Sequence, residues 1–239
     1  MSVVGLIPLR AGGKRIGSIG GVDKDRAILG GHPLMAWTIA AAKDSGVFDE
    51  IIAVTASTDH AALAESYGIK SIRRPDYTVE DASPDIEWVQ WFFSGEVSFD
   101  AFAILRVTSP FRTAQTIVRA WAAFRSTPGI HSLRAVRRVT EHPGKMWVIR
   151  HGRALPLLPM GAEWHSSPTQ SLFDCYLQTA GLEIALVDTV LHTGTIAGSV
   201  ILPWILEEEE ALDINTRDDW SEAVALVEAG LVEVPAGLK

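Results

Sequence analysis

Two patterns of hydrophobic residues alternate along this chain. Short continuous apolar runs are each followed by a segment in which apolar residues recur every three or four positions. Continuous runs of this length are typical of strands buried on both faces of a parallel sheet, whereas the second spacing is typical of one face of a helix. The runs that we interpret as strands are Val3–Leu9, Ile51–Thr55, Ala101–Val107 and Leu182–Val187. Ser132–Val139 is interpreted as a further strand, whose arginines would point outward.

The first helical segment has a clear start and a clear stop. Met35, Ile39 and Ala42 follow Pro33 at spacings that place all three on one helical face. Gly46 stands where such a helix would end, since glycine readily adopts the left-handed conformation of a helix C-terminus.

Further helices complete an alternating order. Thr216 and Asp219 have the spacing of a capping box, with aspartate in place of glutamate, at the start of a last helix. The other helical segments span 60–67, 85–93 and 113–125. Strand and helix in alternation predict an α/β fold with a doubly wound, mostly parallel sheet.

The alternation stops between residues 141 and 176. This segment contains four prolines and three glycines and has few periodic positions. We interpret it as an arm inserted into a single domain that spans residues 1–239. The acidic run Glu207–Glu210 is expected to be a solvated loop or helix end.

Composition narrows the class of protein. Hydrophobic residues make up 47% of the chain, which excludes a disordered protein, and 21 basic against 29 acidic residues give a net charge of −8. That charge argues against a nucleic-acid partner. The single cysteine, Cys175, allows neither an intrachain disulfide nor a thiolate zinc cluster, and we expect it to be a packing residue. Without a signal peptide or a long apolar stretch, the chain is expected to be soluble and cytoplasmic, with no membrane partner.

The loops that follow the strands are the candidate sites, because ligands of open parallel sheets bind at the carboxyl ends of the strands. The first loop is glycine-rich, and together with Arg10, Lys14 and Lys24 it could bind a triphosphate. It matches neither the Walker loop nor the GxGxxG fingerprint. The alternative is a surface loop whose lysines are merely solvated.

Two further loops carry candidate chemistry. Thr108–Thr113 places hydroxyl groups and Arg112 at the start of a helix, although helix capping alone would explain Thr113. Asp213 and Asn215 would point to the same side of an extended segment and offer two oxygen ligands to one cation. The pair Asp23 and Asp25 competes for that role. The signatures of serine hydrolases, zinc proteases and thiol oxidoreductases are absent from the sequence.

These segments, taken in order, resemble a known family. The matching blocks are IPLRAGGK at 7–14, DKDRAILGGHPLMAWTI at 23–39, VTASTD at 54–59, RRP at 73–75, ILRVTSPFRT at 104–113, HPGKMW at 142–147 and DINT at 213–216. They are similar to the acylneuraminate cytidylyltransferases, which make CMP-sialic acid and related CMP-nonulosonates. The resemblance implies a Rossmann-like fold of the nucleotide-diphospho-sugar transferase type and a homodimer formed through the arm at 141–176. It also implies transfer of CMP from CTP to a 2-keto sugar acid, with Mg²⁺ as cofactor.

The resemblance also assigns roles to individual residues. Catalysis would involve Arg10, Lys14 and Asp213. The nucleotide would contact Leu9, Arg10, Ala11, Gly12, Lys14, Lys24, Asp25, Arg74 and Ser109. The sugar acid would contact Arg106, Arg112, Lys145 and Gln170, and the metal would be held by Asp213 and Asn215.

The chain departs from the family pattern mainly on the sugar side. The family has glutamine at Arg106, asparagine at Asp25 and aspartate at Asn215, and its Arg-Gln and Asn-Gly pairs before the late strand are Thr169–Gln170 and Thr179–Ala180 here. We expect the Arg106 guanidinium to pair with the carboxylate of the acceptor, or alternatively to form a salt bridge with a neighbouring acid. A cytidylyltransferase for another acid, such as 3-deoxy-octulosonate or a phosphonate, and a non-catalytic nucleotide-binding protein remain open.

Overall fold

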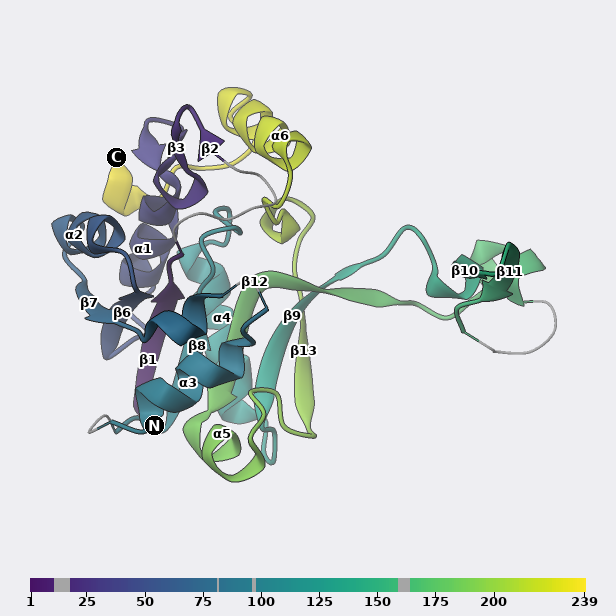
Figure 1. Ribbon diagram of the computed structural model, residues 1–239, viewed down its shortest axis with the longest axis horizontal. Coiled ribbons are helices and arrows are strands. Elements are labelled where there is room, and N and C mark those ends of the chain that lie inside the picture. The colour runs from purple at the N-terminus through teal and green to yellow at the C-terminus, as the bar shows by residue number, and fades with distance from the viewer. Residues whose placement is uncertain (11–17, 81, 96–97, 159–163) are drawn as a thin grey trace.

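A seven-stranded sheet forms the centre of the computed structural model, which describes residues 1–10, 18–80, 82–95, 98–158 and 164–239 (Figure 1). Strand β12 is antiparallel to both of its neighbours and the other pairs are parallel, so the predicted mostly parallel sheet is confirmed. In spatial order the strands are β13 (Ile201–Ile205), β9 (Ser132–Arg138), β12 (Tyr176–Leu186), β8 (Ala101–Ile104), β1 (Val3–Pro8), β6 (Glu50–Thr55) and β7 (Lys70–Arg73).

Helices cover both faces of the sheet because successive residues of a strand point to opposite sides. In β1, Val3 and Ile7 belong to the hydrophobic cluster under one set of helices, and Val4 and Leu6 belong to the cluster under the other. The first set is α1 (Leu34–Ser45), α2 (Thr58–Ser66) and α4 (Ala114–Ser126). The second set is α3 (Asp85–Phe93) and α5 (Val187–Thr193).

The local signals identified most helix ends correctly. Gly46 caps α1 with a φ of 59°, as its position predicted. Thr216 and Asp219 form the capping box of the last helix, α6 (Arg217–Glu228). In the central sheet and the helices that cover it, three elements were missed: β7, α5 and the edge strand β13, whose Pro203 is typical of an edge strand rather than a central one.

Two small hairpins and α6 cover the end of the sheet near the candidate loops. The hairpins are β2 (Ser18–Ile19) with β3 (Val22–Asp23), and β4 (Ile28–Leu29) with β5 (His32–Pro33). Trp37, Phe111 and Ile214 are buried together with α6 in a third hydrophobic cluster. Among the described residues, no helix has the length and apolar character needed to cross a membrane.

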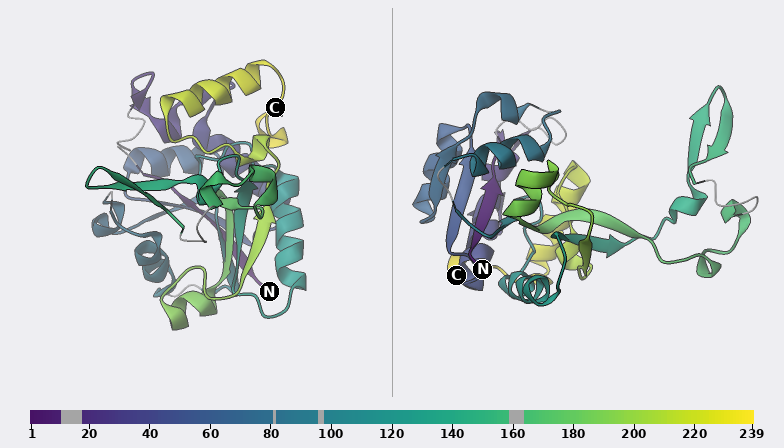
Figure 2. Two further views of the ribbon diagram at one scale, coloured as in Figure 1. Left: turned by 90° about the vertical axis from the view of Figure 1, so that its right-hand side faces the viewer. Right: turned by 90° about the horizontal axis from the view of Figure 1, so that it is seen from below.

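A narrow arm projects far from the sheet (Figures 1 and 2). Strands β9 and β12 lead into it, and its far end carries a hairpin of β10 (Trp147–Arg150) and β11 (Arg153–Pro156). Short 3-10 turns flank the hairpin at Pro143–Lys145, Trp164–Ser166 and Thr169–Ser171. The arm occupies the segment where the sequence pattern stopped. Its part in dimerisation stays a prediction.

The acidic run is not wholly solvated. Glu210 accepts a hydrogen bond of 3.0 Å from the Thr113 hydroxyl and a second from the Thr116 hydroxyl. This contact fastens the turn before residue 213 to the start of α4. The expectation of a solvated run therefore fails for Glu210, because hydroxyl partners 94 and 97 residues away are invisible to a local charge pattern.

Candidate functional site

Three of the candidate loops meet at one point on the carboxyl edge of the sheet. The Lys24 ammonium donates a 2.8 Å hydrogen bond to the Ile214 carbonyl. The Ile214 N–H in turn donates to the Thr108 carbonyl at 2.8 Å. The segment at 213–216 thus joins the loop after β1 to the loop after β8.

Asp25 organises the beginning of the first loop. Its side chain is buried and accepts a 3.1 Å hydrogen bond from the backbone N–H of Arg10. Burial raises the pKa of the Asp25 carboxyl, and the Arg10 N–H opposes that rise. Leu9 is packed in the core and its N–H donates to the Val54 carbonyl, so neither its side chain nor its N–H is available to a nucleotide. The predicted contacts at residues 11, 12 and 14 (Ala11, Gly12 and Lys14) lie outside the described residues.

The competing metal pair in this loop is not open to a cation. Asp23 Oδ1 lies 2.9 Å from the His60 ring, and its Oδ2 accepts a 2.8 Å hydrogen bond from Arg26. Burial tends to raise the pKa of Asp23, but His60 and Arg26 together lower it below its usual value. Because both Asp23 oxygens and one Asp25 oxygen already have partners, this loop presents no free carboxylate pair.

Arg74 and Ser109 are enclosed beneath the same edge. Arg74 is 4% exposed, and its Nε has no hydrogen-bond partner among the described residues. Burial lowers the pKa of Arg74; the charge of Arg10 lowers it further, while that of Asp85 opposes the shift. The Ser109 hydroxyl is also buried and unpartnered in the described part of the chain. Buried polar groups usually have partners, so these two are candidates for ligand contacts.

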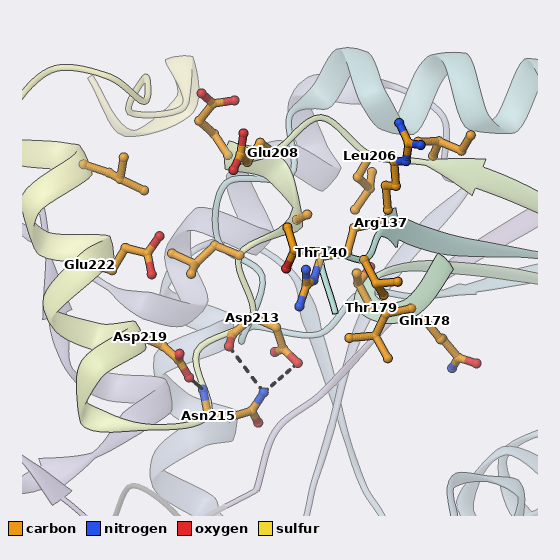
Figure 3. A pocket seen from close by; sticks show the side chains of 18 residues that line it. Arg137, Thr140, Gln178, Thr179, Leu206, Glu208, Asp213, Asn215, Asp219 and Glu222 are labelled. Atoms are coloured by element: carbon orange, nitrogen blue, oxygen red, sulfur yellow. Dashed lines mark hydrogen bonds between the residues drawn. The ribbon is translucent and has the colours of Figure 1, made fainter. Parts of the chain in front are cut away.

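Asp213 and Asn215 lie side by side, as the two-residue spacing predicted (Figure 3). The Asn215 amide donates a 2.7 Å hydrogen bond to Asp213 Oδ2, and Asp219 accepts the Asn215 backbone N–H at 2.8 Å. Asp213 Oδ1 is buried and has no partner among the described residues. One unpartnered carboxylate oxygen and one amide carbonyl oxygen suit a hard cation such as Mg²⁺.

A cation at this pair would need ligands beyond Asp213 and Asn215. The described residues contain no group of three or more His, Cys, Asp or Glu side chains that could hold a metal ion. Asp213 and Asn215 border an open cavity of about 880 Å³ between α6 and the outer ends of β9 and β12. Its opposite wall includes Arg137 and Gln178 (Figure 3). This space gives a substrate access to the pair.

Arg112 does not reach an open surface. It is 1% exposed, and its guanidinium donates hydrogen bonds to the Gly181 carbonyl and, at 3.3 Å, to the Thr38 hydroxyl. Burial lowers the pKa of Arg112 to about 10, against the opposing charge of Glu210. Arg112 therefore clamps strand β12 instead of presenting its charge to an acceptor, which corrects the expectation drawn from the resemblance.

Arg106 forms salt bridges with neighbouring acids, which was the alternative to a contact with the acceptor carboxylate. Its Nη2 donates to Asp85 at 2.6 Å and to Glu183 at 2.8 Å. Arg134 also forms an ion pair with Glu183. The sequence prediction of the site did not include Asp85, Glu183 or Arg134. The signal for Glu183 was available, since a single acid within the apolar run of a strand needs a buried cationic partner.

The two remaining substrate candidates lie on the arm. Lys145 ends the 3-10 turn Pro143–Lys145, and Gln170 is exposed in the turn Thr169–Ser171. The arm extends away from the sheet edge of its own chain (Figure 1). The structure therefore does not bring these two residues together with Arg10, Lys24 and Asp213 within one chain.

Comparison with known proteins finds similarity to cytidylyltransferases and to a CMP-sugar-acid synthase. A family model described as cytidylyltransferase matches residues 4–128. The N-acylneuraminate cytidylyltransferase of Escherichia coli O18:K1:H7 is 29% identical over 224 residues, which are 94% of this chain and 52% of that protein. The CMP-N,N'-diacetyllegionaminic acid synthase of Legionella pneumophila is 27% identical over 238 residues, which cover 95% of this chain and 97% of that protein.

The fold is similar to that of solved sugar-acid and polyol cytidylyltransferases. A CMP:2-keto-3-deoxy-manno-octonic acid synthetase complexed with CTP superposes with a TM-score of 0.70 at 15% identity, covering 96% of this chain and all of the other. The 4-diphosphocytidyl-2C-methyl-D-erythritol synthase of Anaerococcus prevotii superposes with a TM-score of 0.62 at 13% identity, covering 95% of this chain and 98% of the other. This chain spans about half the length of the N-acylneuraminate cytidylyltransferases that it matches.

Proposed function

This chain belongs to the cytidylyltransferase family, and we propose that it transfers CMP from CTP to the anomeric hydroxyl of a sialic-acid-like 2-keto sugar acid. Nucleotide binding is supported by the hydrogen bonds through which Lys24, Ile214 and Thr108 join three loops at the sheet edge. The acceptor class is supported by the relatives that act on N-acylneuraminate or diacetyllegionaminate.

Positive charge gathers where the triphosphate would lie. Arg10 and Lys24 belong to the first loop, and the buried Arg74 lies close enough for the charge of Arg10 to affect its pKa. Cationic donors that are already in place stabilise the negative charge that grows on phosphate oxygens during transfer. Lys24 is oriented by its hydrogen bond to Ile214, so its ammonium requires little rearrangement before catalysis.

The reaction is a single displacement. The anomeric hydroxyl loses its proton to solvent while its oxygen attacks the α-phosphorus. The bond between that phosphorus and the oxygen bridging to the β-phosphorus breaks, and pyrophosphate leaves with the bridging oxygen. No covalent enzyme intermediate is required, which agrees with the lack of a hydrolase nucleophile motif. Asp213 and Asn215 would hold the Mg²⁺, which when bound neutralises charge on the phosphate oxygens. The unpartnered Oδ1 of Asp213 supports this assignment.

We also propose that two copies of the chain associate through the arm in the cytoplasm. The side chains of Trp147 and Ile149 on β10 and Leu155 on β11 are 44%, 69% and 47% exposed. Such a concentration of apolar surface on a thin projection favours burial against another surface. In a homodimer, Lys145 and Gln170 would then reach the active site of the other copy.

Pyrophosphate release tests the proposed function directly. The chain is mixed with Mg²⁺ and each of CTP, UTP, ATP and GTP, and with N-acetylneuraminate, diacetyllegionaminate or 3-deoxy-octulosonate. Release is expected with CTP and a nine-carbon acid. Release only with 3-deoxy-octulosonate would support the other acid class. Thermal stabilisation by CTP without release from any acid would indicate a nucleotide-binding protein that does not catalyse.

A further inference from the structure

A buried histidine attaches the turn that carries Lys24 to helix α2. His60 lies in the first turn of α2, and its side chain is fully enclosed, with 0% exposed. Its Nε2 lies 2.9 Å from Oδ1 of Asp23, the residue that directly precedes the 3-10 turn Lys24–Arg26. Helix α2, which supplies none of the proposed substrate contacts, is therefore connected to the turn that carries one.

The hydrogen in this contact belongs to His60. Burial tends to raise the pKa of Asp23, but its hydrogen bonds with His60 and Arg26 hold that pKa below its usual value. Asp23 is therefore a carboxylate, which can only accept, so Nε2 of the imidazole is the donor. The other Asp23 oxygen accepts a 2.8 Å hydrogen bond from Arg26, whose Nη1 also pairs with Asp59 in the first turn of α2. Both oxygens of Asp23 are thus connected to α2, one directly and one through Arg26.

The burial of His60 is costly, and its contact with Asp23 offsets that cost. Nδ1 of the imidazole is enclosed and has no hydrogen-bond partner among the residues that the structure describes. An unsatisfied polar atom in the interior destabilises a fold, and an apolar side chain in the same place would avoid that cost. A hydrogen bond to an ionised carboxylate is stronger than one between neutral groups. A packing role alone would therefore not favour histidine at this position.

Two contacts of the candidate site depend on the direction of this turn. Lys24 opens the turn and donates to the Ile214 carbonyl at 2.8 Å. Asp25 comes next and accepts the backbone N–H of Arg10 at 3.1 Å. Burial raises the pKa of the Asp25 carboxyl, and both the Arg10 N–H and the nearby His60 oppose that rise. A shift of the turn would therefore move Lys24 and release the start of the nucleotide loop together.

We propose that His60 is a positioning residue for the triphosphate: through Asp23 it fixes the turn that carries Lys24. This inference rests on the proposed function and adds to it a residue that touches neither substrate. The open cavity beside Asp213 is lined by α6 and by the ends of β9, β12 and β13, and it includes no residue of this turn. Loss of the support should therefore weaken CTP binding far more than it affects the acceptor.

Two amide side chains of different length separate this role from a structural one. The side-chain nitrogen of glutamine can occupy the place of the imidazole Nε2, whereas that of asparagine reaches only the place of Nδ1. His60→Gln should keep the affinity for CTP within about twofold of wild type, and His60→Asn should weaken it about tenfold, as expected for a lost hydrogen bond to a charged group. The affinity is measured by titration calorimetry with Mg²⁺ and without an acceptor, so it does not depend on transfer.

The effect should pass through Asp23. Asp23→Ala should weaken CTP binding at least as much as His60→Asn does, and combining the two should cause little further loss, because residues in one hydrogen-bond network are not additive. Amide hydrogen exchange should become faster in the segment 22–29 of both variants. The KM for the acceptor should stay close to that of wild type. Asp23 is 15% exposed, so Asp23→Ala provides a second route if melting temperatures show that His60→Asn fails to fold.

A second histidine–aspartate pair provides the matched control. His192 lies 2.9 Å from Asp188 on the exposed surface of α5, at the opposite end of the sheet (Figure 1), and His192→Asn should bind CTP as wild type does. Equal CTP affinities in His60→Gln and His60→Asn, whether lowered or unchanged, would overturn the inference and leave the proposed function intact. The expected difference between them, without pyrophosphate release from any acid, would support the inference and contradict only the proposed transfer. A wild-type chain that does not bind CTP would overturn both.

Discussion

Replacing Asp213 by alanine should abolish turnover while leaving the metal-free protein at least as stable as the wild type. One Asp213 oxygen is buried without a partner among the described residues, and the other accepts a hydrogen bond from Asn215. The unpartnered acceptor costs about 2 kcal/mol, whereas the hydrogen bond contributes about 1 kcal/mol. Alanine should therefore raise the free energy of unfolding by about 1 kcal/mol, which is about 2–4 °C for a chain of this length.

The assay is thermal unfolding in EDTA and again with Mg²⁺ and CTP, combined with pyrophosphate release. Wild type should gain stability from Mg²⁺ with CTP, and Asp213→Ala should gain much less. Asp218→Ala is a matched control, because Asp218 is an exposed acid at the start of α6. A fall of more than about 5 °C in EDTA for Asp213→Ala would show that the carboxylate supports the fold. A near-normal rate would refute its metal role.

Three other changes test separate parts of the structure. Arg112→Ala should lower the free energy of unfolding, measured in urea, by about 2–4 kcal/mol, because the Gly181 carbonyl loses its hydrogen-bond donor and a buried cavity is left. An unchanged stability with a raised KM for the acceptor would instead support a substrate contact by Arg112. Cys175→Ser should keep most of the turnover, and complete loss in a folded variant would make the thiol functional. Ile149→Asp should convert a dimer to a monomer in light scattering, and a monomeric wild type would contradict the dimer itself.

Local signals in the sequence were enough for the elements that local chemistry determines. Gly46 and the Thr216–Asp219 capping box define helix ends within a few residues of chain, so they can be recognised without the fold. The strand β13 lacked such a signal, since its exposed and covered positions depend on lying at the sheet edge. Its assignment therefore needed the tertiary structure.

In the candidate site, too, the features set by nearby residues could be predicted and those set by distant contacts could not. The Asp213–Asn215 spacing correctly placed both side chains together because an extended segment sets that geometry locally. The partners of Arg106 lie 21 and 77 residues away in sequence, so no spacing rule could choose between an acceptor carboxylate and a protein carboxylate. Arg112 was misjudged for the same reason, because its partner Gly181 is 69 residues away.

The irregular pairing in β12 has a mechanical consequence for the arm. The register of β12 against β9 shifts between Gln178 and Glu183, which separates the arm-side pairs from the pair that contains Glu183. Within that interval the Arg112 guanidinium holds the Gly181 carbonyl. A bulge bends a strand and increases its local twist, so the direction in which the arm leaves the sheet is set at this interval. A substitution at Arg112 or Gly181 would therefore change the angle of the arm as well as the packing beneath it.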